Sequence, residues 1–149
     1  MILFLDFDGV LHPHFPRRDR TDEENQLFSY LSRLESVLRD SPEWKIVISS
    51  SWRENRPWAN VIQAFSPDIA GRILGATPVL KVKEPPYPRY PRHNEVMSFL
   101  EVNGWQDARW LALDDDPALY PPDCESLILC EDGFRETEEV TLREALKLC

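Results

Sequence analysis

Short, mostly apolar runs alternate along this chain with stretches that have the pattern of helices, and this alternation restricts the folds open to it. The apolar runs comprise residues 2–5, 44–48, 73–77, 109–113 and 126–130. The helical stretches comprise residues 21–40, 57–65, 94–102 and a C-terminal segment that starts at Thr141. Alternating strands and helices form a mostly parallel sheet with helices on both faces. We therefore predict a three-layer α/β fold of the Rossmann-like type, with residues 1–149 forming a single domain.

Capping boxes mark two of the predicted helix starts. Thr21 with Glu24, and Thr141 with Glu144, have the spacing at which a hydroxyl and a carboxylate cap backbone N–H groups reciprocally. Apolar side chains recur at helical spacing in the first of these helices, at Leu27, Tyr30, Leu31, Leu34 and Leu38. Residues 79–91 are rich in proline and show no such period, which indicates a loop.

Polar residues follow three of the predicted strands, at the point where each strand ends. The first strand is followed by Asp6-Phe7-Asp8-Gly9, the second by Ser49-Ser50-Ser51 and the fourth by Asp114-Asp115-Asp116. Ligands of parallel α/β sheets bind beyond the carboxyl ends of the strands, so we expect these groups to meet at one edge. Clustered carboxylates repel one another unless a hard cation lies between them, and Mg²⁺ prefers oxygen ligands. The sequence therefore predicts a magnesium site at this edge, with Asp116 capping the next helix instead of binding metal.

The spacing of the carboxylates favours phosphoryl transfer. Asp6 and Asp8 are two residues apart, so in an extended segment both point to the same side. One can attack phosphorus to form an aspartyl-phosphate while the other transfers protons. Ser50 is placed to bond a non-bridging phosphate oxygen, and Arg92, before a helix, is placed to pair with the phosphate charge.

Four segments resemble the motifs of the haloacid dehalogenase (HAD) superfamily, in that family's order. Residues 3–10 (LFLDFDGV) resemble its first motif, residues 46–50 (IVISS) its second, Arg92 its third and residues 111–115 (LALDD) its fourth. More narrowly, the Ser-Ser-Trp-Arg, Thr-Pro and Leu-Asp-Asp-Asp-Pro segments look like the small HAD domains of RNA-repair proteins.

The resemblance implies a role for each matching residue in a Mg²⁺-dependent phosphatase of HAD-like fold. Asp6 would be the nucleophile, and Asp8 the general acid and base that also lends its carbonyl to Mg²⁺. Ser50 would orient the phosphoryl group and Arg92 would offset its charge. Asp114 and Asp115 would hold the metal together with Asp6. The presence of both Asp6 and Asp8 implies a phosphatase, because dehalogenases of the superfamily lack the second aspartate.

Two of these assignments leave alternatives open. Ser49 or Ser51 takes the place of Ser50 if the motif is shifted by one residue, and both are candidates, with Arg53, for contact with the substrate. Lys81 or Lys83 takes the place of Arg92, since the third motif is poorly anchored in sequence.

The spacing of the motifs and the charge pattern bear on the substrate. The interval between Asp8 and Ser49 leaves room for a flap of about a dozen residues beside a strand-helix return, and for no inserted cap domain. Although the net charge is −9, nine of the 17 basic residues fall in three loops expected at the site: Arg17, Arg18, Arg20, Arg53, Arg56, Lys81, Lys83, Arg89 and Arg92. Ordinary surface scatter is the alternative explanation. A nucleic-acid end, a nucleotide, a phosphoprotein and a small metabolite all remain candidate substrates.

Two other functions compete with the phosphatase interpretation. A response-regulator receiver also phosphorylates an aspartate, but its acidic pair lies on the first strand, whereas here the Asp-Asp pair lies on the fourth. A HAD-like binding module without turnover is the second alternative.

We expect His12 and His14 to be surface-loop residues instead of metal ligands, and Cys124, Cys130 and Cys149 to be incidental thiols. The N-terminal apolar run lacks the basic flank and cleavage site of a signal peptide, so a cytoplasmic protein with no membrane partner is expected, its oligomeric state left open.

Overall fold

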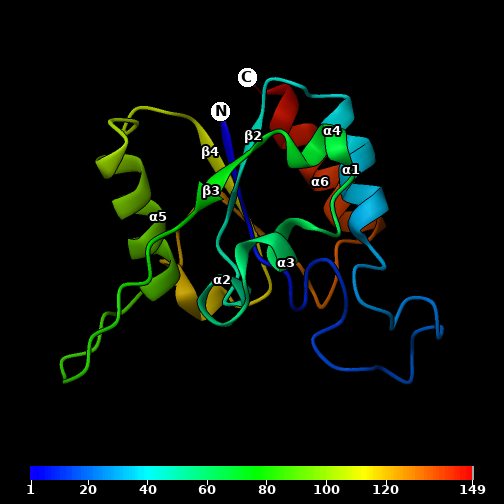
Figure 1. Ribbon diagram of the computed structural model, residues 1–149, viewed down its shortest axis with the longest axis horizontal. Coiled ribbons are helices and arrows are strands. Elements are labelled where there is room, and N and C mark those ends of the chain that lie inside the picture. Colours follow the sequence, from blue (N-terminus) through cyan, green and yellow to red (C-terminus); the bar gives the residue numbers. More distant parts are fainter. Residues whose placement is uncertain (149) are drawn as a thin grey trace.

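A five-stranded sheet forms the centre of the protein (Figure 1). The structure, a computed structural model, describes residues 1–148, so Cys149 lies outside the described residues. The strands are β1 (Ile2–Leu5), β2 (Lys45–Ile48), β3 (Ile73–Ala76), β4 (Trp110–Asp114) and β5 (Leu127–Leu129). They lie in the order β3-β2-β1-β4-β5, and each neighbouring pair is parallel. This arrangement confirms the predicted α/β class and places the carboxyl ends of all five strands at one edge.

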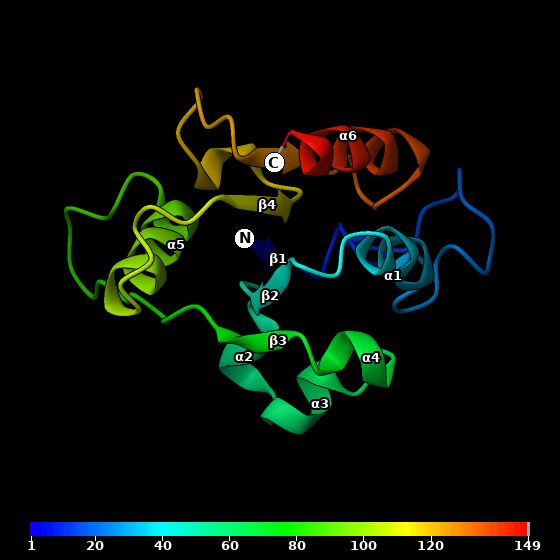
Figure 2. The same ribbon diagram turned by 90° about the horizontal axis from the view of Figure 1, so that it is seen from above.

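Helices cover both faces of the sheet, as Figure 2 shows from above. On one side lie α1 (Leu31–Arg39), α4 (Pro67–Ala70) and α6 (Glu136–Lys147), and on the other lies α5 (Pro91–Val102). The remaining helices are short: α2 (Trp52–Asn55), α3 (Trp58–Ile62) and the 3-10 turn η1 (Pro117–Leu119). Within residues 1–148, no helix is both long and apolar enough to cross a membrane.

The central strand β1 is buried on both faces, because its side chains alternate between two apolar clusters. Leu3 and Leu5 pack in the cluster that contains the buried leucines of α1 and α6. Phe4 packs in the cluster that contains Val96 and Leu100 of α5. The face on which each residue of β1 lies therefore decides which helices its side chain contacts.

The first long helix begins ten residues later than its capping box predicts. Thr21 and Glu24 do make the reciprocal bonds, with Thr21 N donating to Glu24 Oε2 at 3.0 Å and Glu24 N donating to Thr21 Oγ1 at 3.2 Å. The backbone then turns, because Phe28 has a φ of 60°, and α1 begins only at Leu31. Leu27, assigned to the core face by its spacing, is 65% exposed. Tertiary contacts of the 21–30 segment thus override its local helical pattern.

Two other helices begin earlier than predicted. α5 begins at Pro91 instead of residue 94, since proline suits the first helical position, and this places Arg92 in the first turn. α6 begins at Glu136, where Glu138 caps the backbone of Arg135, so Thr141 lies inside the helix and its hydroxyl bonds the carbonyl of Thr137. The short helices α2 and α4 were not predicted.

Candidate active site

A row of four polar residues lies across the carboxyl edge of the sheet. The ladder of β1 with its neighbours continues one residue past the strands, since Ser49 N donates to Leu5 O at 2.9 Å and Asp6 N donates to Leu113 O at 3.1 Å. On the far side of β2, Thr77 N donates to Ile48 O at 2.9 Å. Thr77, Ser49, Asp6 and Asp114 are thereby in register on four adjacent strands.

The alternation of side chains places this row on the α5 side of the sheet. Phe4, two residues before Asp6, packs in the cluster with α5, and so do Val47 and Ala112, which lie two residues before Ser49 and Asp114. The first turn of α5 carries Arg92, whose Nε lies 3.7 Å from Asp114 Oδ2. The row and Arg92 therefore face the same space.

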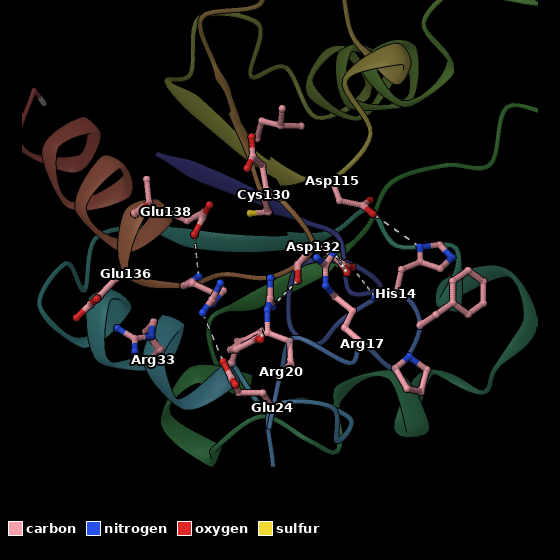
Figure 3. Close-up of a pocket in the computed structure, with 17 residues that line it drawn as sticks. His14, Arg17, Arg20, Glu24, Arg33, Asp115, Cys130, Asp132, Glu136 and Glu138 are labelled. Atoms are coloured by element: carbon pink, nitrogen blue, oxygen red, sulfur yellow. Dashed lines mark hydrogen bonds and ion pairs between the residues drawn. The ribbon is translucent and has the colours of Figure 1, made fainter. Parts of the chain in front are cut away.

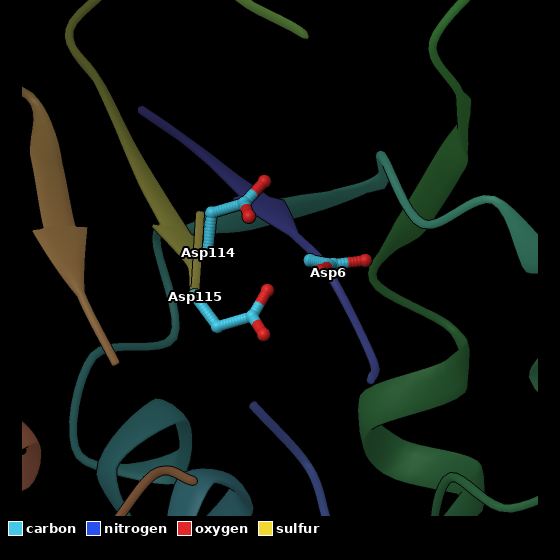
Figure 4. Close-up of side chains that lie close together, drawn as sticks. All are labelled: Asp6, Asp114 and Asp115. Carbon is cyan, nitrogen blue, oxygen red and sulfur yellow. The ribbon is translucent and has the colours of Figure 1, made fainter. Parts of the chain in front are cut away.

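Three carboxylates converge at this edge (Figure 4): each of Asp6, Asp114 and Asp115 offers an oxygen within 4.8 Å of the others. Burial raises the pKa of Asp6, and the charge of Asp114 raises it further. Burial also raises the pKa of Asp114, against the opposing effect of Arg92, and it raises the pKa of Asp115. A set of close, poorly solvated carboxylate oxygens is the donor set that suits Mg²⁺, because the cation removes their mutual repulsion.

Gly9 allows the chain after Asp8 to approach this cluster closely. Its φ is +77°, a left-handed conformation that favours glycine. A Cβ at this position would clash with the carboxylate of Asp115. The glycine of the first motif is thus required both by its backbone conformation and by the carboxylate of Asp115 that lies against it.

Several buried polar atoms at this edge have no protein partner among the described residues: Ser49 Oγ, Thr77 Oγ1 and Arg92 Nη1. Buried polar groups are nearly always hydrogen-bonded in folded proteins. Two of these atoms belong to the polar row and the third to the arginine that faces it. They are suited to bind the oxygens of an anion such as phosphate.

Of the three serines after β2, Ser49 is the one in the polar row. Ser50, the residue predicted to orient the phosphoryl group, is buried, and its Oγ accepts a hydrogen bond from Trp52 N at 3.3 Å. Ser51 is exposed and is the N-terminal flanking residue of α2. The geometry therefore favours Ser49, the alternative from a shift of one residue, over Ser50.

Similar evidence bears on the third motif. Arg92 is largely buried beside Asp114, whereas the Lys81 side chain is 74% exposed and lies 3.4 Å from Glu54. Lys83 is exposed in the same loop. Of the three candidate cations, Arg92 is the one that the structure brings to the acidic cluster.

The carboxylate of Asp8 lies apart from the acidic cluster, between two donors. Its Oδ1 is 2.9 Å from His12 Nε2, and its Oδ2 accepts a hydrogen bond from Trp52 Nε1 at 3.0 Å. The hydrogen bond with His12 is the main cause of the lowered pKa of Asp8. The prediction that His12 is a surface residue is wrong, since its side chain is 2% exposed. The period of a strand or helix gives no signal for such a contact, because both residues lie in a turn. His14 is exposed, as expected, and lies 3.7 Å from Asp115.

Arg53 was predicted to contact the substrate, but in the structure its side chain makes hydrogen bonds with other groups of the protein. Its side chain is 4% exposed, and the guanidinium donates to the carbonyls of Ser49, Ser50, Thr77 and Pro78 and to the carboxylate of Glu95. The loops after β2 and β3 expose carbonyls at the sheet edge that need donors, and this one side chain satisfies them. Arg53 thereby holds the backbone on which Ser49 and Thr77 lie.

Two of the three basic residues of the first loop, Arg17 and Arg20, also have partners within the chain. A pocket of about 970 Å³ lies between this loop, α1 and the start of α6, with Asp115 and His14 at one side (Figure 3). Arg17 pairs with Asp19 and Asp132, and Arg20 bonds the hydroxyl of Tyr30. Acidic and basic side chains alternate around this pocket, so it lacks the uniform positive charge that the loop composition suggested.

Comparison with known proteins agrees with this geometry. Searches of curated proteins and of solved structures gave no match. The family model described as "HAD domain in Swiss Army Knife RNA repair proteins" matches residues 2–138, which include all four motifs and the whole sheet. Because the match spans most of the sequence, the chain belongs to this family of HAD domains from RNA-repair proteins.

Proposed function

We propose that the protein is a Mg²⁺-dependent phosphomonoesterase that acts through an aspartyl-phosphate on Asp6. Membership of a HAD family supports a phosphohydrolase of the HAD type. The observation that carries the proposal is the placement of Asp6 at the centre of the polar row, between Ser49 and Asp114 and within reach of a metal at Asp115. Asp6 directly follows the most buried strand, which gives a nucleophile a well-defined position.

The phosphoryl group is proposed to bind between Asp6, Ser49 and Arg92. Ser49 Oγ and Arg92 Nη1 would donate to its non-bridging oxygens and so gain the partners that the protein does not supply. Asp6, Asp114 and Asp115 would hold Mg²⁺, with the Asp8 carbonyl as a further ligand. When bound, the cation would neutralise charge on the transferred group. This assignment replaces Ser50 by Ser49 and leaves Arg53 in a supporting position.

Two proton transfers by Asp8 would complete the reaction. A carboxylate oxygen of Asp6 attacks phosphorus, the bond from phosphorus to the leaving oxygen breaks, and Asp8 gives its proton to that oxygen. Asp8 then takes a proton from a water molecule as that water attacks the phosphorus of the aspartyl-phosphate. The bond between phosphorus and Asp6 breaks, which releases inorganic phosphate and restores the free carboxylate.

A phosphorylated end of RNA is the proposed substrate class. The family description refers to RNA repair. The loop of residues 78–90 projects away from the body of the protein beside α5 (Figure 1), and it ends next to Arg92. It carries three basic residues and one acidic residue in a chain of net charge −9, and Tyr87 on it is 65% exposed. Basic groups near exposed aromatic rings suit a single-stranded nucleic acid.

The test is a phosphate-release assay on a 3′- or 5′-phosphorylated RNA oligonucleotide, a nucleotide and a small phosphomonoester, with and without Mg²⁺. We expect metal-dependent release that is at least as efficient from the oligonucleotide as from the small ester. Asp6→Asn is the matched inactive control. Tight binding of the phosphorylated RNA without release would instead support the binding-module alternative, and faster turnover of the nucleotide would argue against an RNA end.

A further inference from the structure

Both carboxylate oxygens of Asp8 are held by side chains outside the four motifs. We propose that His12 and Trp52 are positioning residues that fix the Asp8 carboxylate in the orientation needed to protonate the leaving group. The inference rests on the proposed function, in which Asp8 is the general acid and base. It predicts that His12 and Trp52 affect the departure of the leaving oxygen. Binding of the phosphoryl group should not depend on them.

The environment of His12 determines which ring nitrogen carries the proton. The backbone N–H of Phe28 donates to His12 Nδ1 at 3.1 Å, so in the neutral ring this nitrogen is the acceptor and the hydrogen lies on Nε2. His12 Nε2 then donates to Asp8 Oδ1 at 2.9 Å. Phe28 lies within the turn before α1 and has a positive φ, and its backbone N–H reaches a histidine 16 positions earlier in the chain.

Packing restricts the imidazole to this orientation. The ring is 2% exposed, and its centroid lies 5.3 Å from that of Phe28 in an edge-to-face arrangement and 5.8 Å from that of Trp52. Turning the ring over would leave the part-buried Phe28 N–H without its acceptor, which is unfavourable because a desolvated donor needs a partner. His12 is therefore a fixed donor at Asp8.

Trp52 is restrained in a similar way. Its indole packs against Phe7, with 5.5 Å between ring centroids, and the guanidinium of Arg56 lies 3.5 Å from the ring centroid on its face. Because the ring cannot turn freely, its Nε1–H remains directed at Asp8 Oδ2, 3.0 Å away. Two donors from different segments thus hold the two oxygens of one carboxylate.

The arrangement leaves Asp8 able to transfer protons. Each carboxylate oxygen has two lone pairs, and the donors use one on each oxygen. The remaining lone pairs have fixed directions, and one of them would carry the proton that passes to the leaving oxygen. A carboxylate with one donor removed can still carry a proton but loses part of this orientation. Small misplacements of a reacting group lower rates substantially.

The inference predicts an effect that depends on the leaving group. A leaving oxygen of low basicity, as in p-nitrophenyl phosphate, needs little protonation, whereas the alkyl oxygen of glycerol phosphate needs much. Trp52→Phe keeps the aromatic packing and removes the donor. We expect it to lower kcat/KM for glycerol phosphate about tenfold more than for p-nitrophenyl phosphate, a fraction of the full contribution of a general acid. The value of kcat/KM reports steps up to transfer to Asp6, so slow hydrolysis of the intermediate does not mask the effect.

Variants of His12 supply an independent measurement. His12→Leu removes the donor and is expected to show the same dependence on the leaving group, while His12→Gln, which keeps an N–H donor near the position of Nε2, is expected to restore part of the loss. Trp58→Phe, at a 41% exposed tryptophan, is the matched control and is expected to leave both rates unchanged. Circular dichroism identifies variants that do not fold. If the variants at one of the two positions, His12 or Trp52, do not fold, those at the other position test the inference.

An equal loss on both esters, in folded variants of Trp52 and His12, would overturn the inference and leave these side chains with a purely structural role. Failure of the proposed function has a different signature, because the wild type would then hydrolyse neither ester. The ratio of kcat/KM for the two esters is the quantity to compare. If every variant keeps the wild-type ratio, the positioning role is rejected, while Asp8 remains the proposed general acid.

Discussion

Replacing Asp6 by Asn is expected to stabilise the metal-free protein while removing its proposed nucleophile. Oxygens of Asp6, Asp114 and Asp115 lie within 4.8 Å of one another, and the first two residues are buried. Two unit charges about 4 Å apart repel by about 4 kcal/mol at an effective dielectric constant of ~20. Arg92 offsets part of this repulsion from its position 3.7 Å from Asp114. We therefore expect Asp6→Asn to raise the free energy of unfolding by about 2–4 kcal/mol at pH 8 without metal.

The same repulsion gives the effect a pH dependence of known sign. Burial, with the added charge of Asp114, raises the pKa of Asp6 from 3.8 to about 8. A raised pKa means that the folded state retains a proton that the unfolded state has lost. The contribution of Asp6 to the stability of the metal-free wild type is therefore most favourable below about pH 4. This contribution falls as the pH rises toward 8. Asp6→Asn lacks this group, so its advantage over the wild type should grow between pH 5 and pH 8.

Urea denaturation in the presence of a chelator, at pH 5, 6, 7 and 8, measures this difference. Mg²⁺ should then stabilise the wild type at pH 8, because a ligand that binds only the folded state raises its stability, and it should stabilise Asp6→Asn much less. Asp107→Asn, at an exposed carboxylate, is the matched control and should change the stability by less than about 0.5 kcal/mol. If Asp6→Asn destabilises the metal-free protein at pH 8, or if its effect does not vary with pH, the carboxylate-repulsion argument is wrong.

Three further predictions concern single residues of the site. Ser49→Ala should lower kcat for a phosphorylated substrate more than Ser50→Ala does, because only Ser49 lies in the polar row; equal losses would return the assignment to Ser50. Arg92→Ala should weaken substrate binding about 10- to 100-fold, as expected for a charged hydrogen bond of about 1.5–3 kcal/mol, and a substrate titration of KM tests this. Gly9→Ala should lower the free energy of unfolding by about 1–3 kcal/mol in a denaturant titration, since a side chain there has a strained φ and meets Asp115. An unchanged midpoint would contradict the close approach.

Parts of this protein follow from local sequence pattern. A strand such as β1 is an uninterrupted apolar run, and parallel topology follows from the alternation of such runs with helices. Once the strands are parallel, the residues after them share an edge, so the convergence of Asp6, Asp114 and Asp115 could be predicted. The catalytic and metal-binding roles of these residues stay predictions, which the experiments above address.

Other features depend on contacts between residues distant in sequence. Whether a serine faces the site depends on register, since one position moves its side chain to the other side of the sheet, and this separates Ser49 from Ser50. The burial of His12 and the late start of α1 arise together, because the backbone at Phe28 turns to donate to that histidine. Arg53 resembles a substrate-binding arginine in sequence, yet the carbonyls of two loops surround it in the fold. The sequence thus determined the strands and the acidic residues that follow them, while only tertiary packing decided which neighbouring polar groups face the site and which satisfy buried backbone.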